Sequence, residues 1–256
     1  MPIYSVNNPS NDVSLMNENE MNQLLLRKIL RQLKIDPEEH EVKHTPRNIL
    51  MISAEYLPKD LTPQSLHCKS LADGLVDRNM NVNVISYDPW KAGQTVEMGG
   101  VKVHYVNNPI KTYSPLTWAL TLAMEINRTA ADIFHREGGI DLIHAHQWEM
   151  FPCGLSLQAA INKPLIVNYY SLQHHRAPGV SNGYTDSVKQ IEWRGSKDSQ
   201  KVMVNEDWLK NEIIKYYSPE PQKVDVVNSE EKQWTKKIVR DYRWVIKNWS
   251  NRGYEQ

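Results

Sequence analysis

The chain has 256 residues, which is enough for one large domain or two small ones. Its 30 basic and 30 acidic side chains balance, so no overall charge favours nucleic acid or an anionic membrane. Two cysteines are too few for a disulfide framework, and no apolar run approaches the roughly 20 residues of a membrane span. We therefore expect a cytoplasmic protein without a nucleic-acid partner or a membrane span.

Residues 1–46 are expected to form a flexible N-terminal arm that contains one helix. The start is polar and rich in asparagine, unlike a signal peptide. Between residues 18 and 34, apolar side chains recur at the spacing of one helix face, with basic and polar residues between them. This apolar stripe is expected to contact the domain or a partner, and it consists of Leu26, Ile29, Leu30 and Leu33.

Residues 47–228 alternate short apolar runs with helical patterns. Strands are expected at 48–53, 82–87, 100–106, 141–146, 164–170, 201–205 and 223–228. Helices are expected at 63–75, 115–134, 150–161, 187–200 and 206–217. This alternation predicts an α/β fold, with one Rossmann-like, doubly wound, mostly parallel sheet of about seven strands. In such sheets ligands bind beyond the carboxyl ends of the strands.

Residues 229–256 contain a further predicted helix. Trp234, Tyr242 and Trp249 lie on one face of it. The chain has eight tryptophans and twelve tyrosines but two phenylalanines, and amphipathic aromatic residues are enriched at interfaces. We expect this face to bind a protein partner or a second copy of the chain. Packing on the chain's own domain is the alternative.

Several segments in fixed order resemble the N-terminal domain of a glycosyltransferase of family 4 type with the two-Rossmann (GT-B) architecture, a group that includes glycogen and starch synthases. They include ILMISAEYLP, LADGLVDRNMNVNVISYD and DLIHAHQWEMFPCGLSLQAAINKPLIVNYYSLQHHR, and the resemblance runs from about Arg47 to Asn228. It implies that this domain holds the acceptor, while a second domain binds a nucleotide-sugar donor. Residues 231–249 resemble the closing helix of such enzymes. The donor-binding domain is therefore expected to be absent between them.

Two positions depart from the family pattern where donor chemistry is expected. The loop after the first strand, rich in glycine in the family, reads KDLTPQ at residues 59–64. Glycines let backbone N–H groups approach a phosphate, whereas proline removes a donor. The histidine that the family usually has after the fifth strand is replaced by Tyr170.

The loops at the strand ends supply the candidate ligand pocket: Glu55, His146, Trp148, His174, Arg176 and Glu192. The turn from His146 to Trp148 suits stacking on a sugar ring, or else packs the loop on the sheet. His144, His146, His174 and His175 match no standard zinc signature, so no metal is expected. Glu55 and Glu192 would be an acid and a base only if they faced each other.

Two functions are compatible with this sequence. The first is a non-catalytic single domain without a cofactor, which binds a glycan or a protein and regulates or scaffolds an intact enzyme. Transfer needs a positioned donor and a stabilised leaving phosphate, and both are expected to be missing. The alternative is a glycosyltransferase that uses a nucleotide-sugar and is active only with a donor-binding partner.

Overall fold

The computed structural model describes residues 46–58 and 61–250. The predicted N-terminal helix, with Leu26, Ile29, Leu30 and Leu33, lies outside the described residues. All described residues belong to one unit of the chain, residues 45–256.

The described part of the chain forms an eight-stranded sheet in the order β3-β4-β2-β1-β5-β6-β7-β8. The strands are β1 (Asn48–Ser53), β2 (Asn81–Tyr87), β3 (Thr95–Met98), β4 (Val101–Val106), β5 (Leu142–His146), β6 (Leu165–Tyr169), β7 (Lys201–Val204) and β8 (Val224–Val226). All neighbours pair in parallel except β3 and β4. The α/β fold and the seven predicted strands are confirmed.

The eighth strand, β3, was not expected from the sequence. It forms an antiparallel hairpin with β4 through Gly99 and Gly100, whose φ values of 61° and 82° suit a tight hairpin turn. Its four residues TVEM alternate between half-buried and exposed, because β3 lies at the edge of the sheet. An apolar-run criterion misses such a strand.

The helices are α2 (Pro63–Val76), α3 (Pro115–Arg136), α4 (Phe151–Ile161), α5 (Gln173–Arg176), α6 (Gly183–Asp198), α7 (Asp207–Tyr217) and α8 (Trp234–Ser250). Several begin at side-chain caps: Thr62 for α2 and Ser114 for α3, each followed by proline at the first position. α6 begins four residues before the predicted position 187 because Asn182 caps it with a capping box. No described helix is long and apolar enough to cross a membrane.

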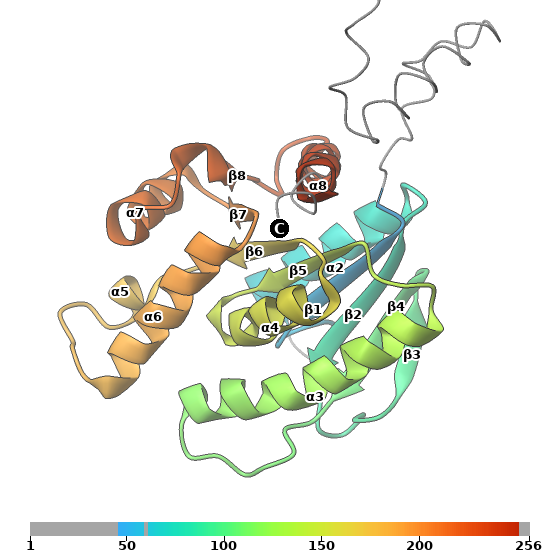
Figure 1. Cartoon of the computed structure of the whole chain (residues 1–256), viewed down its shortest axis with the longest axis horizontal. Helices are drawn as coiled ribbons and strands as arrows, with labels where there is room; N and C mark the ends of the chain where they lie inside the picture. The colour runs from blue at the N-terminus through green and yellow to red at the C-terminus, as the bar shows by residue number, and fades with distance from the viewer. Residues whose placement is uncertain (1–45, 59–60, 251–256) are drawn as a thin grey trace, which may run out of the picture. The chain divides into compact units, whose positions relative to one another are not determined.

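Helices cover both faces of the sheet (Figure 1). α3, α4, α6 and α7 contribute to the hydrophobic core on one face, and α2 and α8 contribute to the core on the other. Residues 227–233 join β8 to α8, and α8 buries Ile238, Tyr242 and Val245 completely. The C-terminal helix therefore packs on the domain of its own chain.

The chain reverses its direction across the sheet between β1 and β5. β1, β2 and β4 build one half, and α3 then carries the chain back to β5 on the other side of β1. The last residues of the two central strands, Ser53 and His146, are partners in the ladder. The loops that follow them, 54–58 and 147–150, therefore meet at the topological switch point, where doubly wound folds bind their ligands.

The close packing of α6 on α4 depends on Gly195, which has no side chain at the point where the two helices meet. A Cβ built on Gly195 would lie 2.5 Å from Phe151 Cδ2 and 3.0 Å from Cε2. We expect Gly195→Ala to lower the free energy of unfolding by about 1–3 kcal/mol, as overpacking does. Urea denaturation measures this.

Gly183→Ala, in the first turn of the same helix, is the matched control because nothing lies within 4 Å of its added Cβ. We expect its stability to be unchanged or up to about 1 kcal/mol higher. Equal stability of Gly195→Ala and the unmodified chain would contradict the close approach of α4 and α6.

Candidate functional site at the carboxyl ends of the strands

A buried network of histidines and tyrosines lies at the carboxyl ends of β5 and β6. The Tyr170 hydroxyl lies 2.7 Å from His67 Nδ1 and 2.9 Å from His146 Nδ1. Farther along β5, His144 Nδ1 lies 2.7 Å from the Tyr242 hydroxyl, and the rings of His144 and His146 are 4.2 Å apart. We call these five residues the His–Tyr network. It joins the sheet to α2 and α8.

The three histidines of this network are neutral at pH 7. Burial lowers the pKa of His67 to about 4 and that of His144 to about 3, and it lowers the pKa of His146 well below its ordinary value. The described residues contain no group of three or more His, Cys, Asp or Glu side chains that could hold a metal ion. The network is thus a hydrogen-bonded core feature.

Side chains of the loop after β1 cap the N-terminus of α2. The Glu55 carboxylate accepts a hydrogen bond from the Thr62 hydroxyl, and Thr62 Oγ1 accepts one from the Ser65 N–H at 3.1 Å. Pro63, the first helical residue, has no N–H to offer. Residues 59 and 60 lie outside the described residues.

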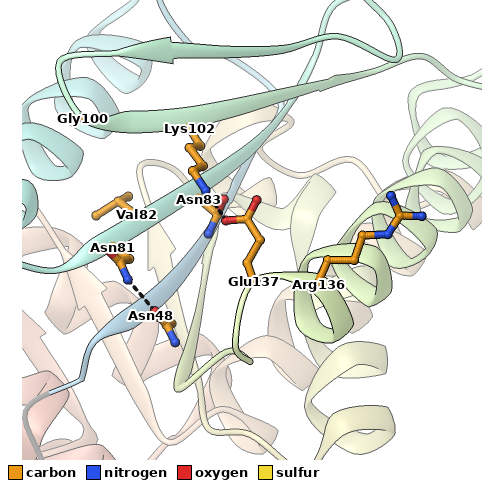
Figure 2. Close-up of a pocket in the computed structure, with 8 residues that line it drawn as sticks. All are labelled: Asn48, Asn81, Val82, Asn83, Gly100, Lys102, Arg136 and Glu137. Atoms are coloured by element: carbon orange, nitrogen blue, oxygen red, sulfur yellow. Dashed lines mark hydrogen bonds and ion pairs between the residues drawn. The ribbon is translucent and has the colours of Figure 1, made fainter.

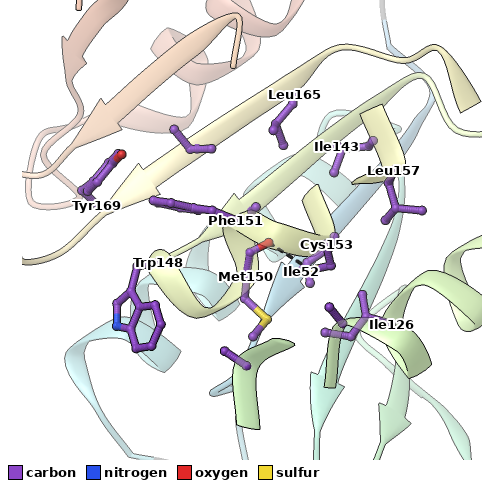
Figure 3. Close-up of a cluster of buried hydrophobic side chains, with 14 of the residues drawn as sticks. Ile52, Ile126, Ile143, Trp148, Met150, Phe151, Cys153, Leu157, Leu165 and Tyr169 are labelled. Carbon is purple, nitrogen blue, oxygen red and sulfur yellow. Dashed lines mark hydrogen bonds between the residues drawn. The ribbon is translucent and has the colours of Figure 1, made fainter. Parts of the chain in front are cut away.

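The turn after β5 is fixed by Gln147, which has a φ of 68°, unusual for a residue other than glycine. Its side chain donates to Ser171 Oγ at 2.9 Å and accepts from the Tyr170 N–H at 3.2 Å. The following Trp148 is 3% exposed and lies beside Met150 and Phe151 in the hydrophobic cluster of Figure 3. Trp148 therefore packs the loop on the sheet instead of presenting a face to a ligand.

Glu192 is the centre of a second buried cluster. Its carboxylate accepts from Arg176 Nη2 at 2.6 Å, from the Gln173 N–H at 3.0 Å and from the Tyr217 hydroxyl. Burial raises the pKa of Glu192, and the nearby Arg176 charge opposes that rise. Arg176 also donates to Ser171 Oγ at 2.8 Å. The Arg176–Glu192 pair therefore fastens the segment after β6 to α6 and α7.

The two adjacent histidines of α5 face α7. The His174 ring stacks on Tyr216 with centroids 3.8 Å apart, and His175 Nε2 lies 3.0 Å from Glu212 Oε2. Neither has a described contact with the His–Tyr network. Of the six sequence candidates, Glu55 lies in the loop after β1 and His146 is the last residue of β5. Arg176 pairs with Glu192, and its guanidinium lies 6.0 Å from the centre of the Trp148 ring. His174 stacks on Tyr216 of α7, apart from the other five.

Two further predicted residues lie in the core. Trp234 is 8% exposed and its ring centroid is 5.0 Å from that of His67, while Tyr242 is completely buried. Their burial assigns them to the core of this chain, not to an exposed interface. Trp249 Nε1 donates to the Asn162 carbonyl at 3.2 Å. The aromatic residue that α8 does expose is Trp244, at 52%.

Sequence reasoning missed Glu149, which lies three residues after the end of β5 and close to the switch point. Burial raises the pKa of Glu149 to about 7; Arg176 lowers it, and the Glu192 and Glu55 carboxylates raise it. Glu149 lines a hollow of about 440 Å³ together with Thr112, Tyr113, Ser114, Pro115 and Trp118. The sequence did place Glu149 directly after the turn that follows β5, where ligands of such folds bind, and this position could have identified it.

A second hollow, of about 460 Å³, lies at the opposite, amino end of the sheet (Figure 2). Its charged side chains are already paired: Lys102 with Glu137 at 2.6 Å and Arg136 with Asp132 at 2.7 Å. It lies away from the switch point, and its charges are neutralised within the chain. We therefore place the candidate ligand site at the carboxyl ends, around Glu149.

The buried histidines make stability depend on pH. Since their folded pKa values lie below the ordinary 6.5, the unfolded chain binds more protons between pH 6.5 and about 4. The stability they contribute is complete above pH 6.5 and is lost as pH falls toward 4. Each histidine adds up to about 1.4 kcal/mol per pH unit. Urea denaturation from pH 7.5 to 5 measures this dependence.

We expect His67→Gln to reduce that dependence because it removes one buried titrating group. His135→Gln is the control, since His135 is exposed on α3, and we expect it to leave the dependence unchanged. A free energy of unfolding that stays constant between pH 7.5 and 5 would contradict the burial of neutral histidines.

The chain is similar to known proteins in both sequence and fold. The family model described as Glycosyltransferase Family 4 matches residues 64–229. A protein of Methanocaldococcus jannaschii, named an uncharacterized glycosyltransferase, is 26% identical over 189 residues; the match covers 73% of this chain and 47% of that protein. The chain thus spans about half the length of this curated relative.

Among solved structures, two chains of sucrose-phosphate synthase from Thermosynechococcus elongatus have the same fold. One matches with a TM-score of 0.57 at 14% identity, covering 77% of this chain and 98% of that chain. The other matches with a TM-score of 0.59 at 15% identity, covering 71% and 48%. At this identity the likeness concerns the fold alone. From the match to the family model, the chain belongs to glycosyltransferase family 4.

Proposed function

We propose that this family 4 domain binds a glycan acceptor at the carboxyl ends of its strands and does not transfer sugar by itself. The observation that carries the proposal is the path from β8 to α8. β8 ends at Val226, and after residues 227–233 the chain enters α8, which packs on the same sheet. In the enzymes that the sequence resembles, the donor-binding domain is expected between such a strand and such a helix.

The N-terminus of α2 supports the same proposal. Phosphate binding at a helix N-terminus needs open backbone N–H groups and close approach. Here Thr62 Oγ1 already accepts the Ser65 N–H, and Pro63 offers no donor. The Glu55 carboxylate, bonded to Thr62, adds negative charge beside this end of the helix. These features disfavour a donor phosphate at the position where the family resemblance places one.

The hollow beside Glu149 suits a sugar. Tyr113 is 92% exposed, and Trp118 lies half-buried with its ring against Tyr87. Aromatic faces stack on the apolar face of a pyranose ring, while the carboxyl of Glu149 and the hydroxyl of Ser114 suit sugar hydroxyl groups. Such a binding domain would act as a regulatory or scaffold subunit for a complete transferase or another protein partner.

A second candidate function is sugar transfer with a donor-binding partner. Glu149 favours it, because burial raises its pKa to about 7, near the value at which a general acid or base works well. We rank it second, since a partner would have to supply the whole donor site.

We expect Tyr113→Ala to weaken glycan binding about tenfold, because it removes the exposed stacking face. The probe is a printed glycan panel, followed by calorimetric titration of the strongest binder. Trp208→Ala is the matched control: Trp208 is 48% exposed on α7, outside this hollow. Glu149→Gln should weaken binding as well.

A folded chain that binds no glycan of the panel would contradict the proposal. So would equal loss of affinity in Tyr113→Ala and Trp208→Ala, because binding would then not depend on this hollow.

A further inference from the structure

A groove of about 730 Å³ runs along the first half of α8, beside Arg78, which follows the end of α2. Glu231, Gln233, Trp234 and Val239 form part of its lining. The other six lining residues are all cations: Arg78, Lys232, Lys236, Lys237, Arg240 and Arg243. The chain as a whole has equal numbers of basic and acidic side chains, yet this groove gathers six cations and the one carboxylate of Glu231.

These cations are poorly neutralised by the chain. Arg78 Nη1 donates to the Gly74 carbonyl at 2.6 Å, and Lys237 Nζ donates to the Val226 carbonyl. Both bonds orient a cation without cancelling its charge. Arg240 lies 3.5 Å from Asp241. Within the described residues, Lys232, Lys236 and Arg243 have no carboxylate partner within 4 Å.

The cations also share a geometry that suits phosphate. Lys236, Arg240 and Arg243 stand at positions i, i+4 and i+7 of α8 and are exposed, so they lie along one helix face. Arginine offers a planar fork that binds phosphate oxygens in pairs. The groove volume falls within the roughly 300–1,000 Å³ that small-molecule sites occupy.

We propose that this groove binds a phosphate-rich anion. The chemistry is the same whether the phosphates belong to a free small molecule or to a lipid headgroup at a membrane surface. The groove is separate from the hollow around Glu149, and the proposal does not depend on glycan binding. Failure of one proposal therefore leaves the other standing.

The experiment has two arms, one for each source. Calorimetric titration with inorganic pyrophosphate tests a free anion. Co-sedimentation with phosphatidylcholine vesicles, with and without phosphatidic acid, tests a headgroup. The variant is Lys236→Gln, Arg240→Gln and Arg243→Gln together. Glutamine removes the charge and has a helix propensity close to that of lysine and arginine, so α8 should remain folded.

The matched control changes the total charge equally, through three helix cations outside the groove: Arg128→Gln, Arg194→Gln and Lys210→Gln. We expect the groove variant to weaken binding by about tenfold or more and the control by less than about twofold. If circular dichroism shows that the groove variant is unfolded, the pair Lys232→Gln and Lys236→Gln replaces it, with an expected loss of about threefold.

Saturable pyrophosphate binding that the groove variant loses supports a free anion as the ligand. Binding to phosphatidic acid vesicles alone, with the same loss, supports a headgroup. Absence of binding in both arms, or equal losses in the groove variant and the control, overturns the proposal.

Discussion

The hydrogen bond between His144 and Tyr242 joins the centre of the sheet to the C-terminal helix. His144 lies on a central strand and Tyr242 in the middle of α8, and both are completely buried. A buried imidazole or hydroxyl without a partner is costly, so each side chain requires the other. Around this bond Ile238 and Val245 bury the apolar face of α8 on the sheet. The final helix is thereby part of the domain core, and everything built on its outer face is fixed to the sheet.

The buried hydrogen bonds around His144 also position the loops at the carboxyl ends of the strands. The His–Tyr network continues from His144 to His146 and Tyr170, so the loop after β6 is anchored beneath the switch point. The Arg176–Glu192 pair anchors the next part of that loop to α6. Glu149 lies between these two fixed regions and the start of α3, which accounts for its burial and its raised pKa. α8 contributes Tyr242 to the His–Tyr network on its buried face, and its exposed cations line the basic groove.

Much of this fold could be predicted from local sequence, because buried parallel strands appear as continuous apolar runs such as NILMIS. β3 was missed because an edge strand needs no such run. The shared face of His144 and His146 follows from the alternation of a strand, but the bond between His144 and Tyr242 joins residues far apart in sequence. The amphipathic pattern of α8 predicts that Trp234 and Tyr242 are buried. It does not tell whether they pack on this chain or on a partner. The raised pKa of Glu149 depends on burial by several loops, which no local pattern encodes.

The proposed function requires a domain that holds an acceptor without completing the transfer. Its most direct test incubates the folded chain with its strongest glycan binder and UDP-, ADP- or GDP-glucose, and measures the release of nucleoside diphosphate. We predict release no faster than in buffer alone. Glycan-dependent release from any of the three donors, lost in Glu149→Gln, would contradict this function and establish the chain as an active transferase.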